Sequence, residues 1–135
     1  MVKPIFNVAG AKVNRLWIKG YQGATIQALQ ITELSGQLMY QPNAYRTMDK
    51  EAIAADVRKE GFDPVYIKDP PGHVYPPHRH PETKLLVFLK GTMVVKVKDQ
   101  KFNCKPRDKL IIPGNSEHSA TVGTEGCVFF WSEKL

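Results

Sequence analysis

The stretch GHVYPPHRHPETKLLVFLKG, residues 72–91, constrains the fold more than any other part of the chain. His78 and His80 lie two residues apart, and on a β-strand such residues point to the same face of the sheet. Two imidazoles on one face can reach a single metal ion. Residues 85–89 are apolar at every position, which favours a strand buried on both faces, and Gly91 follows as a turn signal. This stretch therefore predicts a core strand next to a metal site.

A second stretch, residues 107–120, carries a third histidine. Its apolar run over residues 110–112 indicates a short strand, and the Pro-Gly-Asn sequence of residues 113–115 ends that strand. His118 follows just beyond the turn, where its imidazole can point back toward the first two histidines. The sequence thus predicts a three-histidine metal site formed by two segments.

Residues 49–60 form the one predicted helix. Asp49 is a good N-cap, and Ile53 and Val57 are four residues apart, which makes an apolar stripe. Gly61 stands where a helix usually stops. We expect this helix to pack on the outside of a sheet.

The chain after the helix has the character of an all-β domain. From residue 62 onward, apolar runs such as PVYIK, MVVKVK and CVFFWS alternate with turn signals. Short strands at this spacing are typical of a β-sandwich or β-barrel. Residues 62–135 are therefore the expected core, and the 135-residue chain is long enough for one domain.

The first histidine stretch resembles the first motif of the cupin family. That motif runs Gly, five residues, His-x-His, three or four residues, Glu, six residues, Gly. Gly72, His78, His80 and Gly91 occupy its positions. Lys84 stands where the family has the glutamate that serves as a metal ligand.

The second histidine stretch resembles the second cupin motif, which runs Gly, five residues, Pro-x-Gly-x-x-His-x-x-x-Asn. Pro113 and His118 match it. Arg107 and Asn115 stand at the two glycine positions, and Val122 stands at the final asparagine position. The two motifs occur in the family's order and cover about the last seventy residues.

The resemblance implies a cupin-type jelly-roll barrel, one domain over residues 1–135, with a short helix before the metal-motif strands. In family terms, residues 1–45 supply outer strands of the barrel or an arm that packs on a neighbouring subunit. Small jelly rolls leave sheet edges to cover, so we expect a homodimer.

Lys84 leaves three outcomes open. It can turn away, which leaves a three-histidine site similar to those of cupin dioxygenases that act on thiols or diketones. Glu82 can supply the missing carboxylate if Pro81 shifts the strand register. Alternatively, the ammonium of Lys84 can occupy the cavity and abolish metal binding by repulsion. Inside the barrel, Lys84 can also anchor an anionic substrate or act as a base with a lowered pKa.

Large aromatic residues are candidates to line a pocket near these histidines, or simply to fill the barrel core. They are Tyr75, Phe88, Phe130 and Trp131. The fourth histidine, His73, lies outside the motif positions, and we expect it at the surface.

The charge pattern argues against a nucleic-acid partner. The net charge is +6, and residues 84–109 hold eight basic residues against two acidic ones. However, Lys96 and Lys98 alternate with valines, as on a strand with one face in water, and no aromatic residues interleave with them to stack on bases. We therefore expect a solvated sheet face.

The remaining composition fits an ordinary globular protein. Hydrophobic residues are 42% and charged residues 24% of the chain. No apolar stretch approaches the roughly 20 residues that span a bilayer. Cys104 and Cys127 are too few for a disulfide framework, so we expect two free, partly buried thiols and a cytoplasmic protein without a membrane partner.

The functional prediction combines these points. We expect a metal-binding cupin, with an oxygenase-like enzyme acting on a small molecule as the first interpretation. A non-enzymatic cupin module that binds a small ligand or a metal is the alternative. Imidazole ligands suit iron, zinc or nickel, and the substrate stays open.

Overall fold

The structure, a computed structural model, describes residues 33–34 and 37–135. The predicted N-terminal strands or arm lie for the most part outside the described residues. Of that region, β1 (Glu33–Leu34) pairs antiparallel with β2 (Gln37–Leu38), and β3 (Tyr40–Gln41) pairs with β8 of the main sheet.

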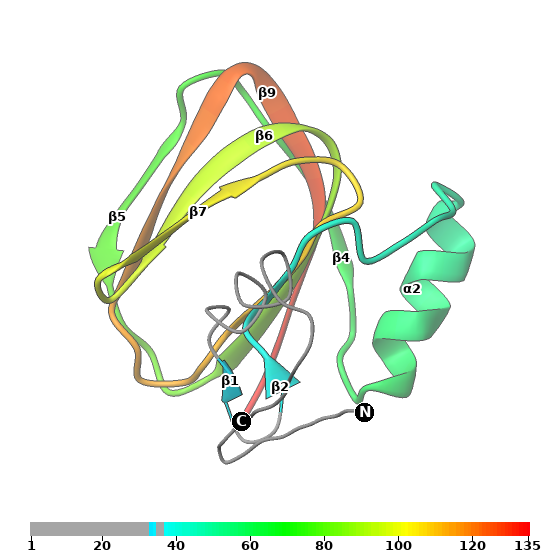
Figure 1. Cartoon of the computed structure of the whole chain (residues 1–135), viewed down its shortest axis with the longest axis horizontal. Coiled ribbons are helices and arrows are strands. Elements are labelled where there is room, and N and C mark those ends of the chain that lie inside the picture. Colours follow the sequence, from blue (N-terminus) through cyan, green and yellow to red (C-terminus); the bar gives the residue numbers. More distant parts are fainter. Residues whose placement is uncertain (1–32, 35–36) are drawn as a thin grey trace, which may run out of the picture. The chain divides into compact units, whose positions relative to one another are not determined.

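Two long antiparallel strands organise the main sheet, and Figure 1 shows β6 and β9 arching side by side. The first half of β6 pairs with β8 and with the end of β9, whereas its second half pairs with β7 and with the beginning of β9. β4 pairs with the end of β9, and β5 pairs with its beginning. Each of them thus adds a strand to one half of the sheet. Two layers thus share two bent strands, which is the predicted jelly roll. The strands are β4 (Val65–Asp69), β5 (Val74–His78), β6 (Thr83–Val97), β7 (Gln100–Cys104), β8 (Lys109–Ile112) and β9 (His118–Lys134).

A close backbone contact marks the bend of the long strands. The pairing of β6 with β9 shifts register on both sides of this bend, between Phe88 and Lys90 and between Gly91 and Met93. Gly91 has φ +75°, and a Cβ atom there would lie 2.0 Å from the carbonyl oxygen of Gly126. Only glycine tolerates both the left-handed backbone and this contact.

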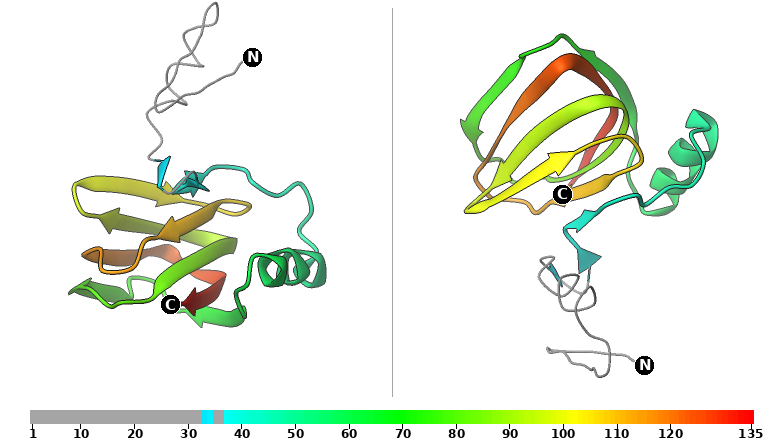
Figure 2. Two further views of the ribbon diagram at one scale, coloured as in Figure 1. Left: turned by 90° about the horizontal axis from the view of Figure 1, so that it is seen from below. Right: turned by 45° about the horizontal axis from the view of Figure 1, so that its top comes forward.

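The predicted helix is α2 (Lys50–Lys59), and it lies outside the barrel next to β4 (Figures 1 and 2). As expected, Asp49 is its N-cap, and the side chain accepts a hydrogen bond from the backbone N–H of Glu51 at 3.0 Å. Ile53 and Val57 are fully buried against the barrel.

Alternate residues of β6 serve two different cores, which explains why the sequence is apolar at every position. Leu86 and Phe88 pack inside the barrel. Leu85 and Val87 pack outward, in a second cluster with the helix. The predicted burial on both faces is therefore confirmed, and helix burial supplies the reason for it.

Two smaller expectations, for the cysteines and for the lysine face of β6, are also met in the described part of the chain. Cys104 and Cys127 are buried free thiols. Lys96 is exposed between the buried Val95 and Val97. Within the described residues, no helix combines the length and the apolar character needed to cross a membrane. The homodimer and the cytoplasmic location stay predictions.

The Gly91 contact can be tested against a glycine with the same backbone. Gly72 also has φ +75°, but nothing lies within 4 Å of its Cβ position. Gly72→Ala should lower the free energy of unfolding by roughly 1–2 kcal/mol, from left-handed strain alone. Gly91→Ala should lower it by about 1–3 kcal/mol more, because the new methyl group overpacks the bend. Urea unfolding measures both values, and equal losses would contradict the steric role of the bend.

Three tyrosines that donate hydrogen bonds to carboxylates should make the protein less stable at alkaline pH. Each hydroxyl donates to a carboxylate: Tyr40 to Asp108 at 2.6 Å, Tyr45 to Asp56 at 2.6 Å and Tyr75 to Asp69 at 2.5 Å. Burial, followed by these hydrogen bonds, raises the three pKa values well above the ordinary value. Unfolded tyrosine loses its proton near pH 10, whereas the folded protein keeps it. The free energy of unfolding should therefore fall as the pH rises above about 10.

Urea unfolding between about pH 8 and pH 11 tests this slope. Tyr45→Phe should make the decline shallower, because it removes one group whose proton the folded state retains. An unchanged slope in Tyr45→Phe would exclude that tyrosine as a cause.

Candidate functional site

Three of the predicted residues come together where β5 ends and β9 begins. His78 is the last residue of β5 and lies opposite His118, the first residue of β9, in the sheet. His80 lies in the loop between β5 and β6. One ring nitrogen from each histidine lies within 4.8 Å of the others. This spacing would allow the three imidazoles to hold one metal ion.

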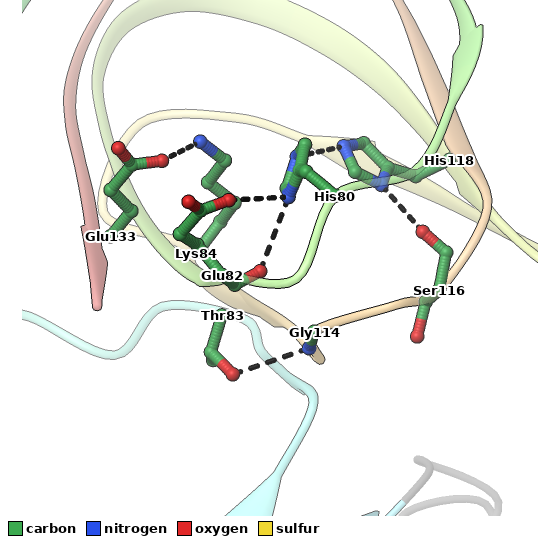
Figure 3. Close-up of polar contacts among 8 residues, drawn as sticks. All are labelled: His80, Glu82, Thr83, Lys84, Gly114, Ser116, His118 and Glu133. Carbon is green, nitrogen blue, oxygen red and sulfur yellow. Dashed lines mark hydrogen bonds and ion pairs between the residues drawn. The ribbon is translucent and has the colours of Figure 1, made fainter. Parts of the chain in front are cut away.

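Backbone carbonyls fix which nitrogen of each ring carries the hydrogen. A carbonyl oxygen can only accept a hydrogen bond, so each Nδ1 bonded to a carbonyl carries the hydrogen and each Nε2 keeps a lone pair. The Nε2 atoms of His80 and His118 are 3.2 Å apart (Figure 3). Two lone pairs at that distance repel each other, so the arrangement favours a cation between them, either a metal ion or a proton. The acceptors of the Nδ1 hydrogens are Pro76 for His78 (2.7 Å), Glu82 for His80 (3.2 Å) and Ser116 for His118 (2.9 Å).

Two loops hold His80 and His118 at this distance. The backbone N–H of Asn115 donates to the carbonyl oxygen of His80 at 2.7 Å, and that of Gly114 donates to Thr83 Oγ1 at 3.2 Å. Gly114 passes so close to the other loop that a Cβ atom there would lie 2.2 Å from the carbonyl oxygen of Pro81. The turn before β9 and the loop before β6 are therefore packed backbone to backbone.

Both positions where the sequence departs from a family glycine keep a left-handed backbone. Arg107 has φ 84° and Asn115 has φ 65°. Asparagine tolerates this conformation better than other side chains do. Arg107 is held there by donating to the carbonyl oxygens of Tyr45 and Arg46. The two motif turns thus keep the conformation that glycine would favour.

Burial sets the protonation of the innermost histidine. It lowers the pKa of His118 below the ordinary value of 6.5, and the nearby His78, His80 and Lys84 lower it further. The hydrogen bond to Ser116 opposes this shift. His118 therefore favours the neutral form, which is the form that binds metals.

Glu82 lies on the other side of His80 from the three converging nitrogens. Its Oε1 atom is 3.7 Å from His80 Nδ1, whereas His80 Nε2 faces His118. At that distance the carboxylate makes no hydrogen bond to the ring, whose Nδ1 donates instead to the carbonyl oxygen of Glu82.

Lys84 lies in the wall of the cavity and does not turn away. Its ammonium sits 4.1 Å from the ring centre of Trp131 and forms an ion pair with Glu133, its cross-strand neighbour on β9 (Figure 3). The side chain of Lys84 is 10% exposed, and that of Glu133 is 37% exposed. The charge at the position of the missing carboxylate is therefore balanced by a partly exposed residue of β9.

The cavity beside the histidines has a volume of about 420 Å³. Tyr75 and Trp131 line it, as predicted, but Phe88 and Phe130 do not. Phe88 is fully buried in the barrel core, and Phe130 packs in the outer cluster because its neighbour Phe129 takes the inward position. The lining residues are Ile67, Tyr75, His78, His80, Lys84, Leu86, Met93, Val95, Ile112, His118, Ala120, Phe129 and Trp131.

Comparison with known proteins supports the family resemblance and the fold. The model of a family described as the AraC-like ligand-binding domain matches residues 65–133. The dimethylsulfoniopropionate lyase DddW of Ruegeria pomeroyi is 34% identical over 59 residues, which cover 44% of this chain and 39% of that protein. The chain therefore spans about two fifths of the length of this curated relative.

Solved structures with a similar fold include two cupins and a lyase. The cupin domain of Schizosaccharomyces pombe Cnp3 has a TM-score of 0.50 at 20% identity, over 53% of this chain and 54% of that one. An RmlC-like cupin from Shewanella frigidimarina has a TM-score of 0.50 at 19% identity, over 53% and 64%. The lyase DddQ from Ruegeria pomeroyi has a TM-score of 0.51 at 17% identity, over 55% and 38%. At these identities the likeness concerns the fold, and it confirms the predicted jelly roll.

Metal binding at this cluster should depend on pH. Protons and metal ions compete for the same Nε2 atoms, so bound zinc should fall as the pH drops below about 6.5. Half-release should lie below that value, because the pKa of His118 is lowered. Equilibrium dialysis between neutral and mildly acidic pH measures the occupancy. A curve that stays flat to about pH 4, well below the ordinary histidine pKa, would contradict a site built from histidines.

Proposed function

Because the chain belongs to the AraC-like ligand-binding domain family of the cupin superfamily, we propose that its barrel holds a divalent metal ion beside a small-molecule pocket. His78, His80 and His118 are the proposed ligands. The observation that carries this proposal is the convergence of three histidine rings, each of which is bonded through Nδ1 to a backbone carbonyl.

The donor set fits a catalytic ion better than a structural one. Structural zinc sites usually have four protein ligands, whereas three leave coordination positions open for a substrate. Neutral imidazoles suit iron, zinc and nickel. Such an ion would supply a Lewis acid, or with iron a route to oxygen chemistry. The backbone carbonyl of Glu82 would hold His80 in its binding orientation.

The chain's own residues suggest how a small molecule would be held. Leu86, Ile112 and Phe129 form part of an apolar wall that would exclude water from the ligand. Lys84 offers a cationic group in the same wall and is the proposed contact for a negatively charged part of the substrate. This combination supports an enzyme that acts on a small molecule with an apolar body.

Two reaction classes follow from different observations. A three-histidine cluster supports the oxygenase-like activity expected from the sequence. The likeness to DddW over 59 residues supports a lyase that acts on dimethylsulfoniopropionate or a related molecule. A binding module without catalysis is the third candidate, and the description of the matching family supports it.

The metal content of histidine variants tests the site. His78→Ala and His118→Ala should each lower metal affinity at least about tenfold, because each removes one of three ligands. His73→Ala is the matched control, since His73 is exposed and lies outside the cluster. Elemental analysis after dialysis measures the stoichiometry. Equal metal content in His73→Ala and His118→Ala would refute the proposed ligands.

Activity and binding assays on the metal-loaded protein then distinguish the candidate functions. Oxygen consumption on a panel of small carboxylates would indicate the oxygenase, and release of dimethyl sulfide and acrylate from dimethylsulfoniopropionate would indicate the lyase. Tight ligand binding without turnover would indicate the binding module. In each assay, His118→Ala should lose the signal and His73→Ala should retain it.

A further inference from the structure

We propose that Lys84 is an anion-binding residue of the pocket and that Glu133 is a built-in counter-ion which the carboxylate of a ligand displaces. This inference rests on the proposed function in one respect, namely that the cavity takes a small molecule. It adds the chemical class of that molecule, a short carboxylate with an apolar body.

Lys84 is fixed in place by its surroundings. It lies on the central strand β6, paired with Ile112 on one side and Glu133 on the other. Its side chain is 10% exposed, and its ammonium lies over the ring of Trp131, 4.1 Å from the ring centre. A buried ammonium requires a negative partner, so Lys84 will bind whichever carboxylate offers the better contact.

Glu133 is the partner that can leave. Its side chain is 37% exposed, and it is the second-last residue of the final strand, β9. Moving its carboxylate from Lys84 into water therefore carries a small desolvation change, since the group is already partly hydrated. The unequal exposure of the two partners means that a competing carboxylate would replace Glu133 while Lys84 stays.

The rest of the cavity wall selects the ligand's charge. Among the described residues that line the cavity, Lys84 is the one Lys, Arg, Asp or Glu. The ring face of Trp131 could otherwise attract a cation, but the ammonium of Lys84 already lies over it. The remaining wall is mostly aliphatic and aromatic. The pocket therefore favours one carboxylate joined to an apolar body.

A second buried lysine provides a matched control. Lys109 pairs with Glu60, and the two side chains are 10% and 30% exposed, close to the values for Lys84 and Glu133. Lys109 does not line the cavity, and its partner belongs to the end of α2. Removing the charge of Lys109 thus perturbs a similar ion pair without touching the pocket.

The test uses butyrate and its neutral analogue butyramide as probes of the 135-residue chain. Trp131 emission reports binding, in a Trp17→Phe background that leaves Trp131 as the single tryptophan. The parent protein should bind butyrate more tightly than butyramide. Lys84→Met should lose that preference, whereas Lys109→Met should keep it. Glu133→Gln should tighten butyrate binding roughly two- to fivefold, because the competing carboxylate is gone.

Each alternative result has a defined meaning. Equal binding of the two probes by the parent protein, or an unchanged preference in Lys84→Met, would overturn the anion-binding role. Weaker or unchanged butyrate binding in Glu133→Gln would overturn displacement of the counter-ion. Metal content is measured on the same samples, so the two proposals fail separately. A lysine-dependent preference in a protein that binds no metal would uphold this inference and reject the metal centre.

Discussion

The backbone contact between Gly91 and Gly126 lets β6 and β9 bend together without losing their pairing. Because β9 curves around the barrel, residues near both of its ends line the same cavity. His118 at its start joins the histidine cluster, and Trp131 near its end lies beneath Lys84. A straight strand of the same length would separate these groups by tens of ångströms. The curvature of β9 thus complements the packed loops that hold His80 and His118.

Features with a local sequence pattern were predictable. The capped helix and the apolar run of β6 follow from short-range rules, and the resemblance of two separate stretches to the cupin motifs predicted that the three histidines come together. Features that depend on cross-strand register and have no motif of their own were not predictable. Glu133 lies 49 residues from Lys84, and its pairing follows from a register that shifts at the bend. The outward position of Phe130 was not predictable either, because the sequence does not show which face of a strand the helix covers.

The two buried lysines show how one physical problem is solved in two settings. An ammonium removed from water is unfavourable unless a carboxylate accompanies it. Lys109 meets this need with Glu60 and thereby connects β8 to the end of the helix. Lys84 meets it with Glu133, but on the side of the barrel that holds the cavity. The same pairing therefore contributes to packing in one place and to the chemistry of a pocket in the other.

The hydrogen bonds that orient the three histidines all end on peptide carbonyls. Peptide carbonyls are present whatever amino acid occupies the position, so no single codon change removes one while the chain keeps its path. The orientation of the imidazoles therefore depends on the path of the backbone and not on the identity of neighbouring side chains. Descendants of this sequence could exchange most residues of the cavity wall, and with them the preferred ligand, while the histidines kept their orientation.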